Sequence, residues 1–223
     1  MLGHADLITC LDQEALDIAQ RSAPTVRCEL LANPAEPDEI FMPADTTDEL
    51  VLFAGEIGLR KGADVLWRTW QLVASRRPDA QCLMVGPVHD YLPPDAERLE
   101  LLSPVDHSQM RELLRRARAI ALPSRAEGMP MILIEAMSLG RPFVSTPVGG
   151  IPELARAGGL LVPVEDEIAL ADRLTELLAE PDLARMIGER GRKFCIETHG
   201  IDVIDARLRT FYSELTHKRR SRD

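Results

Sequence analysis

The sequence predicts an α/β protein built on a parallel sheet with helices on both faces. One observation is a series of short, nearly continuous apolar runs, of which residues 50–55 are the clearest. Strands of this kind are buried on both faces, as in parallel sheets. A second observation is that these runs alternate with helical spacing, as at residues 62–76, where Val65, Leu66 and Val73 share one face.

The expected elements follow in order along the chain. After residue 50 we expect strands at residues 50–55, 81–86, 99–102, 119–123, 142–145 and 159–162. We expect helices at residues 62–76, 108–118, 131–139, 168–179, 183–198 and 203–216. Ligands bind beyond the carboxyl ends of the strands in such sheets. A site is therefore expected in the loops that follow Gly55, Gly86, Leu102, Pro123 and Ser145.

The first part of the chain is organised differently. Residues 5–10, 13–20 and 26–31 predict a strand, a helix and a strand, and a proline-rich loop follows. One such unit cannot bury its own faces, so we expect it to pack against something else. The sequence thus predicts three segments: residues 1–45 as the remnant of a preceding domain with a linker, 46–200 as the sheet domain, and 201–223 as a helix with a basic tail.

Charge and hydropathy exclude several classes of protein. A net charge of −10 argues against nucleic acid as a partner. No run approaches the roughly 20 apolar residues of a membrane span, and the first residues lack the basic start of a secretory signal, so we expect a cytoplasmic protein. The basic residues 217–222 are interpreted as a solvated C-terminus. The alternative is contact with anionic lipid head groups, peripherally at the inner face of a membrane.

Neither the cysteines nor the histidines are spaced as metal ligands. Cys10, Cys28, Cys82 and Cys195 stand singly, three of them in apolar runs, and we expect buried reduced thiols. The five histidines are equally dispersed, and no D-x-D motif occurs. We therefore expect no metal and no other cofactor.

The strongest single feature is the segment Pro123–Met137, which reads as a strand end, a loop and a helix start. Pro130 suits the first turn of that helix. The free N–H groups from Gly128 to Ile132 would point into the crevice, with the positive end of the helix dipole behind them, and would suit an anion or a polyhydroxyl group. Glu127 and Glu135 add carboxylates, which accept hydrogen bonds from paired sugar hydroxyls. Taken alone, both glutamates could equally be helix-start and exposed-face charges.

With its neighbours, this segment resembles the E-x7-E motif of the group 1 (family four) retaining glycosyltransferases. The matching pieces keep the family's order over residues 50–195, and only the ordered set is specific. They are Phe53-Ala54-Gly55, Arg60-Lys61-Gly62, Met84-Val85-Gly86, Pro123-Ser124, Glu127-Gly128, Glu135-Ala136-Met137, Gly140-Arg141-Pro142, Gly149-Gly150-Ile151-Pro152-Glu153, Gly159-Leu160-Leu161-Val162 and Met186 with Gly188. The resemblance implies the C-terminal half of a GT-B fold: a Rossmann-like domain that binds a nucleotide sugar, preceded only by the end of the N-terminal acceptor domain.

The resemblance also implies roles for individual residues. Lys61 matches the lysine that contacts the donor diphosphate, and Glu127 matches the glutamate near the hydroxyls of the transferred sugar. These two are the expected catalytic residues. Glu135 matches the glutamate that holds the ribose.

The other expected donor-binding residues lie in loops. The backbone of Gly128-Met129-Pro130, continuing to Met131, faces the sugar in the family. Gly149-Gly150 matches a tight turn near the diphosphate, with a plain turn as the alternative. Arg60 adjoins the lysine. Glu153 opens the following helix and could be only a first-turn charge.

One position departs from the family pattern. The family usually has an arginine directly after the first strand's glycine, and here that residue is Glu56. A carboxylate there repels a diphosphate unless it points away. Arg60 or Arg125 could supply the missing charge. Without compensation, losing one charge-assisted contact costs on the order of 1.5–3 kcal/mol.

The implied activity is transfer of a sugar from a nucleotide diphosphate sugar to an acceptor sugar or lipid-linked glycan. The resemblance implies that the anomeric configuration is retained, and in this family retention is commonly attributed to front-face attack. It also implies a role in polysaccharide or glycoconjugate synthesis. The isolated chain would need the missing N-terminal domain or a partner chain for transfer.

Other readings of the sequence stay open. The main one is a non-catalytic, nucleotide-sugar-binding or partner subunit of a split glycosyltransferase, which Glu56 favours and the retained Lys61, Glu127 and Glu135 oppose. A nicotinamide-dependent dehydrogenase is disfavoured because no G-x-G-x-x-G pattern follows the first long strand. A related epimerase or phosphorylase is equally remote. The identities of the nucleotide, the sugar and the acceptor do not follow from these residues.

Overall fold

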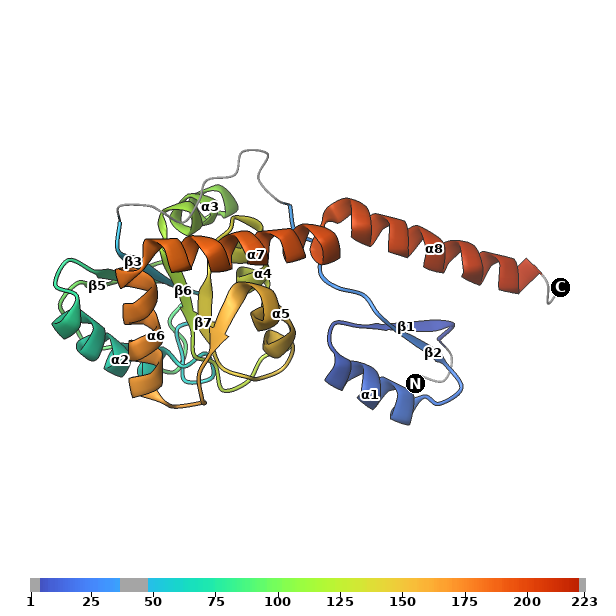
Figure 1. The fold of residues 1–223 in the computed structure, drawn as a ribbon. Helices are drawn as coiled ribbons and strands as arrows, with labels where there is room; N and C mark the ends of the chain where they lie inside the picture. Colours follow the sequence, from blue (N-terminus) through green and yellow to red (C-terminus); the bar gives the residue numbers. More distant parts are fainter. Residues whose placement is uncertain (1–4, 37–47, 221–223) are drawn as a thin grey trace.

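The structure is a computed structural model that describes residues 5–36 and 48–220, without the side chains of 218–220. Within these residues it contains a six-stranded sheet, a separate strand pair and helices around both (Figure 1). The elements are β1 Leu7–Cys10, α1 Gln13–Ser22, β2 Arg27–Leu30, β3 Leu50–Ala54, α2 Ala63–Arg76, β4 Gln81–Val85, β5 Leu99–Leu102, α3 His107–Arg116, β6 Ala119–Leu122, α4 Met131–Ser138, β7 Phe143–Ser145, α5 Ile151–Gly158, β8 Gly159–Leu161, α6 Glu167–Ala179, α7 Pro181–His199 and α8 Ile201–Arg220.

The large sheet has the strand order β5-β4-β3-β6-β7-β8, and every pair in it is parallel. The predicted α/β fold class is therefore confirmed. The chain runs outward from β3 to β5, then returns to the other side of β3 and runs outward again from β6 to β8. The order reverses between β3 and β6, and ligands bind at the carboxyl ends of strands at such a switch point.

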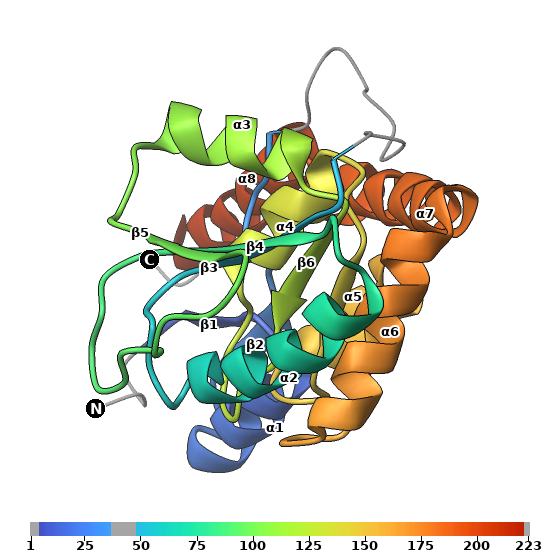
Figure 2. The same cartoon turned by 90° about the vertical axis from the view of Figure 1, so that its left-hand side faces the viewer.

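The sheet is covered on both faces, as the apolar runs predicted. All residues of β3 are buried, and so are Trp70 of α2 and Phe143 of β7. Figure 2 shows α2 and α6 on one side of the sheet and α3 and α4 on the other. The buried indole of Trp70 donates its N–H to the carbonyl of Glu97 at 2.9 Å, so the largest core side chain leaves no polar atom unpaired.

The N-terminal strands β1 and β2 are parallel, with α1 between them in sequence, as expected. This unit lies apart from the large sheet, and α8 extends alongside it (Figure 1). Phe211 of α8 is buried, with the guanidinium groups of Arg27 and Arg207 at 5.5 and 6.0 Å from its ring centre. Arg207 also donates to the carbonyl of Leu30 at 2.7 Å. The chain's own last helix thus supplies part of the packing that this unit needs.

The two connections between the N-terminal unit and the sheet domain meet at one point. The N–H of Ala35 donates to the carbonyl of His199 at 2.7 Å, and Ala35 pairs with Gly200 in an isolated parallel bridge. Nδ1 of His199 lies 2.9 Å from the carbonyl oxygen of Asn33 and must carry the proton, since a carbonyl only accepts. The rest of the expected linker, residues 37–45, lies outside the described residues.

The boundaries match the expectation within two residues, except that α8 extends from Ile201 to Arg220, past its expected end at residue 216. Several of the small differences have local causes. α6 begins at Glu167 because the carboxylate of Asp166 caps it by accepting from the N–H of Ala169 at 2.8 Å. α7 begins at Pro181, since proline suits the first turn. α8 begins at Ile201, directly after α7, and the backbone stays helical to Arg220. Among the helices described, none is long and apolar enough to cross a membrane.

Candidate functional site

The loops at the switch point bring Lys61 and Glu127 together. Lys61 lies in the loop after β3, and its Nζ is 2.6 Å from Oε1 of Glu127 in the loop after β6. Oγ of Ser124 donates to the same oxygen at 2.7 Å. The two side chains are only 15% and 5% exposed, so the pair is largely shielded from water. Ser124 belongs to the quoted motif, but its hydrogen bond to Glu127 could not be inferred from the sequence.

The two glycines after β7 fit against the loop that carries Glu127. Gly149 has a φ of +54°, and a Cβ there would lie 2.3 Å from the carbonyl oxygen of Glu127. The N–H of Gly150 donates to the carbonyl of Gly128 at 2.8 Å. A Cβ on Gly128, by contrast, would meet nothing within 4 Å. The Gly149-Gly150 turn therefore supports the Glu127 loop from behind, and Gly128 faces open space that a ligand could fill.

Helix α4 begins at Met131, directly after this turn. Its N-cap is Pro130, and no side chain caps the first N–H groups. Pro130 was expected in the first turn of this helix, and it lies one residue before that turn, at the N-cap. Met129 is buried while Met131 is 38% exposed. The backbone from Gly128 to Met131 lies at the positive end of the helix dipole.

Glu135 and Met131 border a separate cavity of about 430 Å³. Its other lining residues are Pro34, Ala35, Glu36, His107, Arg111, Ser138 and Ile201. Burial raises the pKa of Glu135, against the opposing charges of His107 and Arg111. His107 and Arg111 were not predicted as site residues from the sequence, although their spacing of four residues on one helix places them on the same face. The structure therefore places the two motif glutamates at different places, Glu127 beside Lys61 and Glu135 in this cavity.

Glu56 departs from the family pattern, and the two arginines that could replace the family's arginine already form other contacts. Nη2 of Arg60 is 3.8 Å from Oε1 of Glu56, and Nη1 of Arg60 donates to the carbonyl of Ala126 at 3.4 Å. Arg125 forms ion pairs with Asp64 and Glu165 instead of turning toward Lys61. The hypothesis that Arg125 replaces the family's arginine is therefore not supported by its geometry. The Arg60 side chain is half exposed, and its guanidinium is paired with the carboxylate of Glu56.

The cysteines are free thiols, and Cys10, Cys82 and Cys195 are buried while Cys28 is half-buried. Burial raises the pKa of Cys195 to about 12 and that of Cys82 further still. These thiols are therefore unreactive core groups. Across residues 5–36 and 48–220, no group of three or more His, Cys, Asp or Glu side chains is placed to hold a metal ion.

Comparison with known proteins places the chain in a family. The family of group 1 glycosyl transferases matches residues 48–180. D-inositol 3-phosphate glycosyltransferases from Streptomyces scabiei and Xylanimonas cellulosilytica are 27% and 30% identical, over 99% and 89% of this chain. The chain spans 58% and 50% of the length of these two relatives.

Solved structures agree on the fold. Sucrose-phosphate synthase from Thermosynechococcus elongatus superposes with a TM-score of 0.77 at 22% identity, over 97% of this chain and 60% of that one. The Anabaena protein HepE, in complex with UDP and glucose, also gives 0.77, at 16% identity, over 94% of this chain and 64% of that one. The parallel sheet, the order of the motifs and these matches lead to one conclusion: the chain belongs to the group 1 glycosyl transferases, with the GT-B fold.

Proposed function

We propose that this chain is the donor-binding part of a retaining glycosyltransferase. It would take a sugar from a nucleotide diphosphate sugar for transfer to an acceptor sugar or lipid-linked glycan, in polysaccharide or glycoconjugate synthesis. The observation that carries the proposal is the shielded Lys61–Glu127 pair, 2.6 Å apart, at the switch point between β3 and β6. The open turn at Gly128 and the uncapped start of α4 border the same place.

The diphosphate, the transferred sugar and the ribose of the donor each have a matching group in this arrangement. The ammonium of Lys61 and the N–H groups at the start of α4 suit the diphosphate, which gains charge as it leaves. The Glu127 carboxylate suits hydroxyls of the transferred sugar, and Glu135 suits the two ribose hydroxyls. Because Lys61 and the helix start supply the positive charge, the proposal needs no metal ion. It agrees with the UDP complexes formed by proteins of the same fold, such as HepE.

The transfer step balances without a further reactant. The bond from the anomeric carbon to the diphosphate oxygen breaks, and a bond to the acceptor's hydroxyl oxygen forms on the same face of the sugar. The hydroxyl proton passes to the leaving diphosphate. The chain spans 58% and 50% of the length of its relatives, so we assign acceptor binding to an N-terminal domain or a partner chain.

Calorimetric titration of the purified chain with UDP-, GDP- and ADP-sugars tests the proposal. We expect one nucleotide class to bind, and binding to be lost in Glu135→Ala, which truncates a side chain of the 430 Å³ cavity. Glu153→Ala is the matched control, since Glu153 is exposed in the first turn of α5. Absence of binding to all three donor classes would contradict the proposal.

A second candidate function is a non-catalytic partner subunit, and Glu56 is the observation that favours it. Its carboxylate lies 3.8 Å from Arg60 and 4.0 Å from Nδ1 of His89, beside the loop that carries Lys61. Glu56→Arg discriminates the two candidates, with Glu56→Gln as the control for loss of negative charge alone. Tighter donor binding only in Glu56→Arg indicates a decayed site, whereas unchanged binding in both variants supports an intact one.

A further inference from the structure

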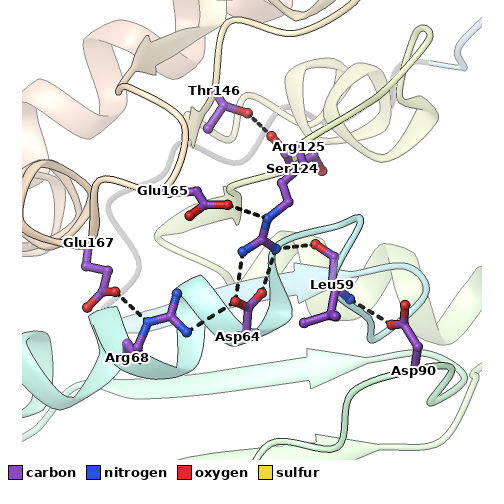
Figure 3. A network of polar contacts seen from close by, with 9 residues as sticks. All are labelled: Leu59, Asp64, Arg68, Asp90, Ser124, Arg125, Thr146, Glu165 and Glu167. Carbon is purple, nitrogen blue, oxygen red and sulfur yellow. Dashed lines mark hydrogen bonds and ion pairs between the residues drawn. The ribbon is translucent and has the colours of Figure 1, made fainter.

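An ion-pair network surrounds Arg125, which lies between Ser124 and Glu127 in the motif (Figure 3). Its guanidinium forms two hydrogen bonds with the carboxylate of Asp64, from Nη1 at 2.7 Å and from Nη2 at 2.8 Å. Its Nε donates to Oε1 of Glu165 at 2.7 Å, and Nη1 also donates to the carbonyl of Leu59. All three guanidinium nitrogens are therefore engaged within the protein.

These contacts lie on both sides of Lys61 in the sequence. Leu59 precedes Lys61, and Asp64 follows it in the first turn of α2. The N–H of Arg125 adds a backbone hydrogen bond to the carbonyl of Arg60 at 2.8 Å. Arg125 thus fastens the loop that carries Lys61 to the loop that carries Glu127. The 2.6 Å ion pair bridges these same two loops.

The two loops also fit closely at their backbones. Gly62 has a φ of +72°, and a Cβ there would lie 2.0 Å from the carbonyl oxygen of Pro123. Oγ1 of Thr146, from the loop after β7, donates to the carbonyl of Ser124 at 2.5 Å (Figure 3). The residues directly before Arg125 are therefore held from two sides, and its side chain adds a further attachment between the loops.

The pairing with Asp64 is suited to fixing geometry. The Asp64 side chain is only 9% exposed and that of Arg125 is 27% exposed. Burial acts to raise the pKa of Asp64, but the hydrogen bonds and charges of Arg125 and Arg68 outweigh it and hold the pKa below its usual value. Asp64 is therefore a carboxylate at neutral pH. A two-bond pair between arginine and carboxylate fixes orientation as well as distance.

We propose that Arg125 is a positioning residue for the donor diphosphate, which it serves by holding the Lys61 loop against the Glu127 loop. The inference rests on the proposed function, in which Lys61 contacts the diphosphate. Arg125 acts through Lys61 and does not touch the ligand. Its loss would let the two loops shift against each other, while the Glu135 cavity, which Arg125 does not line, would keep its shape.

Titration with two kinds of ligand tests this role. UDP, GDP and ADP would reach Lys61, whereas uridine, guanosine and adenosine would reach only the nucleoside part of the site. In Arg125→Met we expect the affinity for the nucleoside diphosphate to fall by about tenfold or more, as after loss of a charge-assisted phosphate contact. The affinity for the free nucleoside should change by less than about twofold, as expected for a distant site.

Arg68→Met is the matched control. Arg68 also pairs with Asp64, at 3.1 Å, and with Glu167 at 2.5 Å, but it holds neither Leu59 nor Arg60. We expect this variant to keep both affinities. If Arg125→Met does not fold, Asp64→Asn replaces it, because the amide keeps the shape and removes the charge. The same selective loss is expected there, smaller in size.

The outcomes separate the inference from the function on which it rests. Unchanged diphosphate affinity in a folded Arg125→Met overturns the positioning role, and so does an equal loss for nucleoside and nucleoside diphosphate. An equal selective loss in Arg68→Met also overturns it. Failure of the unaltered chain to bind UDP, GDP and ADP alike contradicts the proposed function itself, and the inference that rests on it is then contradicted as well.

Discussion

At the scale of single residues, Lys61 has an internal partner where the resemblance expects a ligand. Its ammonium lies 2.6 Å from Glu127, and Ser124 donates to the same carboxylate oxygen. A diphosphate must therefore compete with Glu127 for Lys61. If the hydroxyls of the sugar engage Glu127 at the same time, this competition favours a complete nucleotide sugar over the nucleotide alone.

We predict that Glu127→Gln binds UDP or GDP more tightly than the unaltered chain, by about threefold to tenfold. The reason is that the variant removes a charge-assisted partner of Lys61. It should also lose any preference for the nucleotide sugar over the nucleotide. Calorimetry with both ligands measures the two effects. Weaker binding of the nucleotide would show that Glu127 does not compete for Lys61.

Glu135, the proposed ribose-binding residue, has a cost in stability at neutral pH. Burial raises its pKa, so the folded protein favours the protonated form. The stability that this group contributes is present below its unfolded pKa, near 4.5, and is lost as the pH rises through the higher folded pKa. At pH 7 the charged carboxylate is therefore destabilising.

We predict that Glu135→Gln raises the melting temperature at pH 7, by at most about 4 °C, the shift that 1 kcal/mol produces in a chain of this size. The gain should shrink as the pH falls toward 4.5, and nucleotide affinity should decrease at neutral pH. Thermal melts at a series of pH values measure the first effect. The exposed Glu153→Gln serves as control, and an equal gain there would argue against the burial of Glu135 as the cause.

At the scale of elements, the site depends on the contact between the loops after β6 and after β7. Gly149 carries a left-handed φ of +54° and lies against the carbonyl oxygens of Glu127 and Gly128. Gly128 has open space around its Cα and no positive φ. Gly149 packs against the back of the loop after β6, whereas Gly128 lies on the open side of that loop. Alanine variants at the two positions can therefore be compared directly.

We predict that Gly149→Ala lowers the free energy of unfolding by about 2 kcal/mol or more, because a side chain adds backbone strain and a clash. Gly128→Ala should change stability by less than about 0.5 kcal/mol, as at an open surface position. It should nevertheless weaken donor binding by filling the space in front of the turn. Urea denaturation and calorimetry separate these effects, and equal stability losses would contradict the loop contact seen here.

The elements themselves were largely predictable, for a local reason. β3 and β4 lie within the predicted apolar runs, since nearly every residue of a central parallel strand is buried. The start of α6 was predicted to within one residue, and its exact position is set by the capping side chain of Asp166. The exact residues at which α7 ends and α8 begins were not predictable, because tertiary bonds at His199 and Ala35 separate the two helices.

At the scale of the whole molecule, His199 lies where both connections to the N-terminal unit meet. It is 2% exposed, and its ring nitrogen donates to the carbonyl of Asn33 at 2.9 Å. Burial lowers its pKa below 6.5, although this hydrogen bond and the charge of Glu153 act in the opposite direction. The folded protein therefore favours the neutral form of the His199 ring over the protonated form.

We predict that the stability contributed by His199 is complete above about pH 6.5 and is lost as the pH falls through the lower folded pKa. Between pH 7.5 and 5, the unaltered chain should lose on the order of 1 kcal/mol more than His199→Gln does. Urea denaturation of both proteins at the two pH values measures this difference. Equal losses would show that His199 does not sense pH at the junction.

The sequence by itself determined the fold class, the order of the elements and the family, because each is encoded by local patterns: apolar runs, helical spacing and short motifs. It also named Lys61, Glu127 and Glu135. Only the tertiary structure decided that Lys61 pairs with Glu127 across two loops, that Glu135 lies in a separate cavity with His107 and Arg111, and that Arg125 binds Asp64. These contacts join residues up to 66 positions apart, and chain packing, not local spacing, sets which side chains meet.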